Sequence, residues 1–203
     1  MMKRTLITVL ITVAALIVVA VAAGLAVLYT GAYDVAATTE HASVTRWALN
    51  TLQHRSVSAR AASVEGAPPT DSISLAHGFE HFHLMCVQCH GAPGLDRGEV
   101  GKGMTPTPPR LEEEAHEWSD AELFWITRHG IRLAGMPAFG STHGDAEIWA
   151  IVGFVRRLET MTEQDYATLV REWSAAREAA RAGGAGEDPG GHAHAPGTPP
   201  HGH

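Results

Sequence analysis

The feature that most constrains this chain is a five-residue stretch, Cys86-Val87-Gln88-Cys89-His90. This C-x-x-C-H spacing is the attachment signature of c-type haem. The two thiols become thioethers to the porphyrin vinyl groups, and the adjacent histidine is placed under the iron as one axial ligand. Cys86 and Cys89 are the only cysteines in the chain, so the motif uses both. We therefore expect one covalent haem c, attached through Cys86 and Cys89, with His90 as an iron ligand.

Two other chemistries use cysteine pairs at this spacing. A thioredoxin-type redox pair is expected at a strand-to-helix turn of a βαβ unit, and no β-branched strand run precedes Cys86. A structural zinc site needs a second pair of Cys or His ligands at matched spacing. Histidine-rich stretches exist elsewhere in the chain, so the zinc alternative stays open.

The N-terminus carries a long apolar run that fits export from the cytoplasm. Lys3 and Arg4 precede a stretch from Thr5 to Tyr33 that contains no charged residue. About 20 apolar residues cross a bilayer as a helix, whereas the apolar region of a cleaved signal peptide has roughly 7–15 residues. The small residues at 21–23 could form a cleavage site, but they lie too deep in the run. We expect an uncleaved signal anchor, with the remaining chain outside the cytoplasm.

Helical periodicity recurs through the rest of the chain. Apolar residues at three- and four-residue spacing predict a helix over 41–63, which serves either as an interfacial helix or, as we favour, as a spacer. A second helix is predicted from about Ser74 into the haem motif. A capping box at 119–122 opens a third helix, which ends near Gly130.

Two more helices are expected towards the C-terminus, over about 145–158 and from Thr162 to about Arg181. The chain therefore predicts an all-α protein. The predicted parts are a transmembrane signal anchor (1–34), a spacer helix and linker (35–72), a haem domain (73–160), an accessory helix (161–182) and a disordered histidine-rich tail (183–203).

A haem iron needs a sixth ligand, and Met136 is the best-placed candidate. It lies 46 residues after His90 in a loop stiffened by Pro137. A thioether is soft and neutral, so it favours ferrous iron. Core packing is the alternative role for this side chain, and His129 and His143 are the fallback ligands. The other methionines begin the anchor, adjoin or closely follow the haem motif, or lie beyond the last core helix: Met1, Met2, Met85, Met104 and Met161.

Residues 74–160 resemble a class I cytochrome c, the family with a single haem and His/Met ligation. The family places a glycine eight residues and an aromatic residue four residues before the first cysteine, and here these are Gly78 and Phe82. Pro109-Arg110-Leu111 matches a Pro-x-Leu that often follows the haem motif. The Gly-Met-Pro-Ala-Phe-Gly sequence at 135–140 resembles the methionine-ligand loop of bacterial members.

The resemblance implies about four helices wrapped around one haem. By that resemblance the Pro109 carbonyl accepts the Nδ1 proton of His90, and Leu111 packs on the ring. Gly78 would let its helix cross the C-terminal helix closely beside Phe154. The resemblance does not identify a partner for the haem propionates, for which Arg128, Arg132, Trp118 and Trp125 are candidates.

The expected function is electron transfer rather than catalysis, since no catalytic constellation accompanies the haem motif. We expect a single-pass protein of the bacterial inner membrane with its haem domain in the periplasm. A quinol-oxidising complex would donate electrons, and an oxidase or reductase would accept them. The formal charge of −7, without a basic cluster, argues against nucleic-acid binding.

Two other functions remain open from the sequence. The chain could be the haem c subunit of a larger membrane oxidoreductase. It could also be a haem-based sensor or a metal-handling protein, in which the histidine-rich tail binds a metal ion. The tail histidines are His192, His194, His201 and His203.

Overall fold

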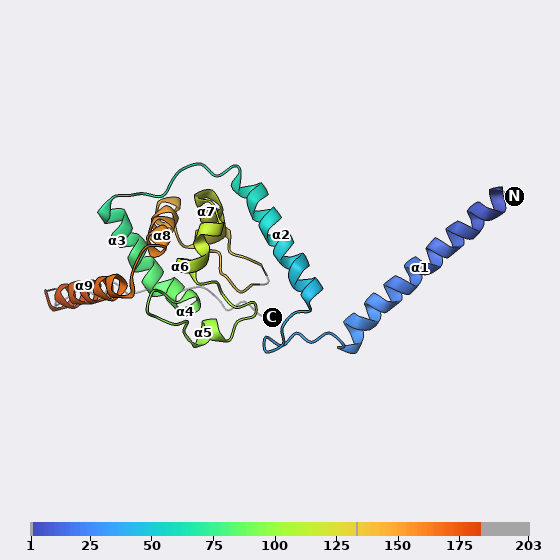
Figure 1. Cartoon of the computed structure of the whole chain (residues 1–203), viewed down its shortest axis with the longest axis horizontal. Coiled ribbons are helices and arrows are strands. Elements are labelled where there is room, and N and C mark those ends of the chain that lie inside the picture. Colours follow the sequence, from blue (N-terminus) through green and yellow to red (C-terminus); the bar gives the residue numbers. More distant parts are fainter. Residues whose placement is uncertain (1, 133, 184–203) are drawn as a thin grey trace, which may run out of the picture.

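The computed structural model describes residues 2–132 and 134–183, and over these residues it contains helices, turns and loops but no strand. The predicted all-α class is therefore confirmed. Helix α1 stands apart, and the remaining helices gather into one body (Figure 1). In chain order the elements are α1 (Met2–Thr30), α2 (Ser43–Ala61), α3 (Ser72–His81), η1 (Phe82–Cys86), α4 (Val87–His90), α5 (Glu99–Lys102), α6 (Leu111–Glu114), η2 (Ala115–Glu117), α7 (Asp120–His129), η3 (Phe139–Ser141), α8 (Asp145–Leu158) and α9 (Glu163–Gly183).

Helix α1 contains the apolar run of the sequence. It has 29 residues, and none of them is buried against the rest of the protein. Its length and composition are sufficient to cross a membrane. The helix could therefore be the expected membrane anchor.

The centre of the body is the crossing of α3 and α8. A β-carbon at Gly78 of α3 would lie 2.1 Å from the backbone oxygen of Ala150 in α8, so only glycine fits this crossing without a shift of the helices. Phe82 is fully buried, and its ring centroid lies 5.4 Å from that of Phe154. The close crossing beside Phe154 that the resemblance implied is thus present.

Helix α7 begins with the capping box that its sequence predicts, and α8 begins with a similar contact. At α7 the backbone nitrogen of Glu122 donates to Ser119 Oγ, and the backbone nitrogen of Ser119 donates to Glu122 Oε2. Gly130 ends α7 with a φ of 65°. At α8 a carboxylate oxygen of Glu147 accepts from the backbone nitrogen of Gly144 at 2.8 Å. These contacts satisfy donors that the first turn of a helix leaves free.

Helix α2 forms where the sequence predicts a helix, but it does not stand off from the domain as a spacer. Val57 and Ala61 are buried, and α2 packs against α7. The hydroxyl of Ser58 donates to Glu122 Oε1. The packed face contains Val57 and Ala61, whereas the larger apolar residues on which the sequence interpretation rested point elsewhere. Trp47 and Leu52 remain exposed.

Helix α9 packs on the core through a stripe of apolar and aromatic residues. Tyr166 is buried, and Leu169, Val170 and Trp173 pack against the core. The hydroxyl of Tyr166 lies 2.9 Å from Nδ1 of His83, which belongs to η1. The histidine-rich tail was predicted over 183–203; Gly183 is the last residue of α9, and the rest of the tail, with the histidines of the predicted metal site, lies outside the described residues.

Candidate functional site

A largely apolar cavity of about 320 Å³ contains the residues of the haem motif. Its lining includes Cys86, Cys89 and His90 of the haem motif. It also includes Met136, which lies in a loop 46 residues after His90. The structure therefore brings the four predicted attachment and ligand residues to one place. Leu111, predicted to pack on the ring, also lines the cavity, together with Leu123, Ile126, Ile151, Val152 and Val155.

The helix that carries the motif changes its winding just before the first cysteine. Phe82–Cys86 form one turn of π-helix between α3 and α4. Such turns occur mostly as single bulges in α-helices, frequently at functional sites. His90 ends α4, and Gly91 follows with a φ of 73°, which turns the chain away from the helix. The motif thus sits at the end of a continuous helical segment.

The environment of the cysteines is unlike that of a redox-active pair. Burial raises the pKa of the Cys86 thiol to about 12, and the nearby Cys89 adds to this effect. Reactive cysteines of C-x-x-C redox motifs have a lowered pKa because the thiolate is the nucleophile. The surroundings of Cys86 therefore oppose the thioredoxin-type alternative and suit sulfurs that end as neutral thioethers.

The ring of His90 is held by a hydrogen bond at one of its two nitrogens, Nδ1. Its Nδ1 lies 2.8 Å from the backbone oxygen of Pro109, which can only accept, so Nδ1 carries the proton. Burial lowers the pKa of His90, and the hydrogen bond to Pro109 opposes this shift. The buried neutral ring then leaves Nε2 with a free lone pair, as a metal ligand requires.

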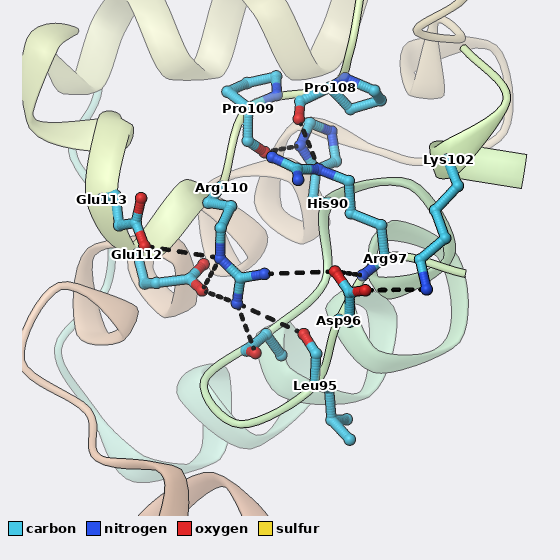
Figure 2. A network of polar contacts seen from close by, with 11 residues as sticks. His90, Leu95, Asp96, Arg97, Lys102, Pro108, Pro109, Arg110, Glu112 and Glu113 are labelled. Atoms are coloured by element: carbon cyan, nitrogen blue, oxygen red, sulfur yellow. Dashed lines mark hydrogen bonds and ion pairs between the residues drawn. The ribbon is translucent and has the colours of Figure 1, made fainter. Parts of the chain in front are cut away.

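Arg110, to which the sequence pattern gives no role, fixes the segment that holds His90. Arg110 donates through Nε to Glu112 Oε1 at 2.8 Å and through Nη2 to the backbone oxygen of Ala92 at 3.2 Å. It also pairs with Asp96, which in turn binds Lys102 (Figure 2). These contacts join the turn after the haem motif to the segment that contains Pro109.

A second arginine supports the same segment. Arg97 donates through Nε to the backbone oxygen of Pro108 at 2.8 Å. The orientation of His90 thus depends on both Arg97 and Arg110 (Figure 2). The Pro-x-Leu pattern indicates roles for Pro109 and Leu111, but it predicts none for Arg110, the residue between them.

The loop that contains Met136 is held by its own backbone. The nitrogen of Ile131 donates to the oxygen of Met136 at 3.2 Å. A β-carbon at Gly130 would come within 2.5 Å of that same oxygen, and Gly130 has a positive φ. Only glycine therefore allows this close approach without strain. Met136 therefore lines the cavity from a loop whose two ends are joined by a backbone hydrogen bond.

Another methionine lies close to this loop. Met104 lines the cavity, and its terminal methyl group lies 2.6 Å from where a β-carbon at Gly135 would be. Met85 lines the cavity as well. Met104 belongs to the segment that leads to Pro109, whereas Met136 comes from a separate loop. Of the fallback ligands, neither His129 nor His143 lines the cavity.

Helix α2 supplies two cavity residues that the sequence did not indicate. Gln53 and His54 both line the cavity, and the ring of His54 stacks on Trp118 with centroids 4.3 Å apart. Trp118 is also the one propionate candidate that lines the cavity; Arg128, Arg132 and Trp125 do not. Arg128 instead pairs with Asp145.

The described residues give no support to the zinc alternative. Within 2–132 and 134–183, no group of three or more His, Cys, Asp or Glu side chains is arranged to hold a metal ion. The residues of the cavity suit a different group. Two thiols, an imidazole and a thioether meet in an apolar hollow, and this donor set fits a haem rather than a zinc ion.

Comparison with known families agrees with this geometry. Residues 74–155 match the family model described as cytochrome c oxidase, cbb3-type, subunit III, which is a c-type cytochrome domain. A comparison with curated proteins found no match. The matched segment runs from α3 to α8 and includes both the haem motif and Met136. It excludes α1, α2 and α9. Residues 74–155 thus resemble a c-type cytochrome domain, and together with the N-terminal apolar helix this match fits a membrane-anchored class I c-type cytochrome.

Proposed function

We propose that this protein carries single electrons through one haem c, bound covalently by Cys86 and Cys89 and ligated by His90 and Met136. The observation that carries the proposal is the meeting of these four side chains in one apolar cavity. When bound, haem supplies a one-electron couple whose potential depends on its ligands and surroundings.

His90 and Met136 would occupy both axial positions of the iron. No position is then left for a substrate, which favours outer-sphere electron transfer over catalysis. The bond from His90 Nδ1 to the Pro109 oxygen sets the tautomer and the orientation of the ring. The neutral thioether of Met136 favours the ferrous state, so the ligand pair predicts a higher potential than two histidines would give.

The apolar walls of the cavity exclude water from the site. Leu123, Ile151, Val152 and Val155 are buried, and they line the cavity from α7 and α8. A dry environment disfavours the more highly charged ferric state and raises the potential further. Little rearrangement is needed on electron transfer, because the walls belong to packed helices.

Helix α1 would anchor the protein in the bacterial inner membrane. Its apolar face is entirely unburied, and Lys3 and Arg4 at its start favour an N-terminus in the cytoplasm. The cytochrome domain would then lie in the periplasm. In the respiratory chain, a quinol-oxidising complex would serve as the donor, and an oxidase or a reductase as the acceptor.

The full chain, produced in a bacterial host that matures haem c and purified in mild detergent, tests the proposal. We expect haem to remain bound to the polypeptide after denaturation, with a mass increase of one haem. A titration between oxidant and reductant should show one reversible one-electron transition. A Cys89→Ser variant should retain the haem through one thioether only. Loss of all haem on denaturation, or a couple that cannot be cycled, would contradict the proposal.

The family match favours one second possibility. The matched model is described as a subunit of a cbb3-type cytochrome c oxidase, so this chain could deliver electrons as the haem c subunit of a membrane oxidoreductase. Its cytochrome chemistry would be unchanged. Size-exclusion chromatography of detergent-solubilised native membranes distinguishes the two roles. A stable complex with a catalytic subunit supports the subunit role, whereas a monodisperse single chain supports the independent carrier.

A further inference from the structure

The cytochrome cavity extends beyond the segment that the family model covers. The match spans residues 74–155, yet Gln53 and His54 of α2 line the same cavity as the haem motif. The chain that leads into α2 also contacts this region, because the hydroxyl of Thr105 donates to the backbone oxygen of Ala37. Helix α2 therefore contributes residues to the cavity wall that the matched segment does not contain.

Several contacts fix α2 at this place. Val57 and Ala61 are almost completely buried, at 1% and 4% exposure. The hydroxyl of Ser58 donates to the carboxylate of Glu122, which also accepts from the backbone nitrogen of Ser119 at the start of α7. The ring of His54 is nearly parallel to the Trp118 indole, with an angle of 9° between their planes. The cavity-facing residues of α2 are thus held by the packing of the turn that follows them and by the stacking of His54 on Trp118.

The cavity needs hydrogen-bond donors for the cofactor that we propose. A haem carries two propionate carboxylates, which are anionic at neutral pH. Among the described residues that line the cavity there is no lysine or arginine, and Glu114 and Glu117 carry negative charge. The lining side chains with an N–H or O–H group to donate are Gln53 and His54 of α2, Trp118, on which His54 stacks, and the hydroxyls of Thr107 and Thr127.

We propose that α2 completes the haem site, and that His54, with Gln53 beside it, donates a hydrogen bond to a haem propionate while its ring holds Trp118 in place. This inference rests on the proposed haem function and adds residues outside the matched domain to the site. The ligand group is a carboxylate. A charge-assisted bond to it is about twice as strong as a neutral one.

The contact has a consequence for the reduction potential. An unneutralised carboxylate near the iron stabilises the ferric state, and water entering at that edge does the same. Removing the donor should therefore lower the potential. We expect roughly a tenfold change in the reduction equilibrium constant, which is about 59 mV for a one-electron couple.

The test compares three variants of the full chain in detergent by redox titration. His54→Ala removes both the donor and the stacking ring. His54→Phe keeps an aromatic ring on Trp118 but cannot donate. Arg55→Ala is the control, because Arg55 is the next residue on the same helix, is exposed, and does not line the cavity. We expect a lower potential for both His54 variants and a potential close to wild type for Arg55→Ala.

Two results would overturn the inference. If His54→Phe keeps the wild-type potential while His54→Ala lowers it, the ring merely covers the edge and donates nothing. If neither variant differs from Arg55→Ala, His54 makes no contact with a haem propionate. In both cases the wild-type protein would still show a covalent, reversible haem. A wild-type chain without covalent haem would instead refute the proposed function itself.

Discussion

The crossing of α3 and α8 makes Gly78→Ala the most informative single substitution for the fold. The added β-carbon would lie 2.1 Å from the Ala150 oxygen and 3.0 Å from the β-carbon of Phe154. Ordinary contact begins at 3.4 Å, so the two helices would have to separate by about 1.3 Å at this point. The nearest atom is backbone, which cannot turn away as a flexible side chain can.

The cost can be estimated from this geometry. Overpacking a core typically costs about 1–3 kcal/mol, and a backbone obstacle places Gly78→Ala at the upper end. Replacing glycine by alanine within a helix returns about 1 kcal/mol through helix propensity. The net loss is then about 2 kcal/mol, which lowers the midpoint of thermal unfolding by roughly 8 °C at about 4 °C per kcal/mol.

Thermal unfolding of the full haem-loaded chain in detergent, followed by the haem absorbance, measures this loss. Gly103→Ala is the matched control, because its nearest neighbour would lie at 3.5 Å, an ordinary contact distance. Adding Phe154→Leu to Gly78→Ala should give no rescue, since the main obstacle is the Ala150 oxygen. A midpoint for Gly78→Ala within 2 °C of that for Gly103→Ala would refute the reasoning.

Three further substitutions test other contacts. Burial raises the pKa of Glu122, but the hydrogen bonds from Ser58 and Ser119 together outweigh it and hold this pKa below its ordinary value. The stability that ionised Glu122 gives the folded protein is therefore present above the ordinary pKa and is lost as the pH falls through the lowered one. The thermal midpoints of wild type and Glu122→Gln should thus converge on acidification, and a difference independent of pH would contradict this. Arg156→Lys should lower the free energy of unfolding by about 2 kcal/mol in denaturant titration. Lysine cannot replace a guanidinium that binds two carboxylates and two backbone oxygens. An unchanged denaturation midpoint would show that these contacts are dispensable. Tyr166→Phe should lower the free energy of unfolding by about 1 kcal/mol in the same assay, because Nδ1 of the partly buried His83 loses its hydrogen-bond partner. An unchanged free energy would mean that water replaces the tyrosine hydroxyl.

The sequence predicted those parts of the fold that depend on local chemistry. Ser119 and Glu122 form the expected capping box, and the helix predicted over 145–158 is observed with the same ends. The close crossing at Gly78 and the bond between His90 and Pro109 were implied by the resemblance to class I cytochrome c, and both are present. Each of these features is recognisable within a few residues or from one known spacing.

The missed features depend on contacts between distant segments. Helix α2 was expected to be a spacer because its large apolar residues suggested a different face from the one that packs. Its contacts with α7 run through Val57 and Ser58, which have no strong signal. Arg110 lies in a stretch rich in charge, and only the fold shows that it joins two loops behind His90. The same limit applies to His54, which faces the cavity only once α2 is packed.

The identity of the second iron ligand is the central claim, and an optical spectrum of the ferric protein tests it directly. Met136→Leu should abolish the near-infrared-edge band that marks methionine bound to ferric haem iron. Met104→Leu is the control, since Met104 lines the same cavity and lies against the same loop. We predict that the band is present in wild type and Met104→Leu and absent in Met136→Leu. A band that survives in Met136→Leu, or one that is missing from the wild-type spectrum, would contradict the account.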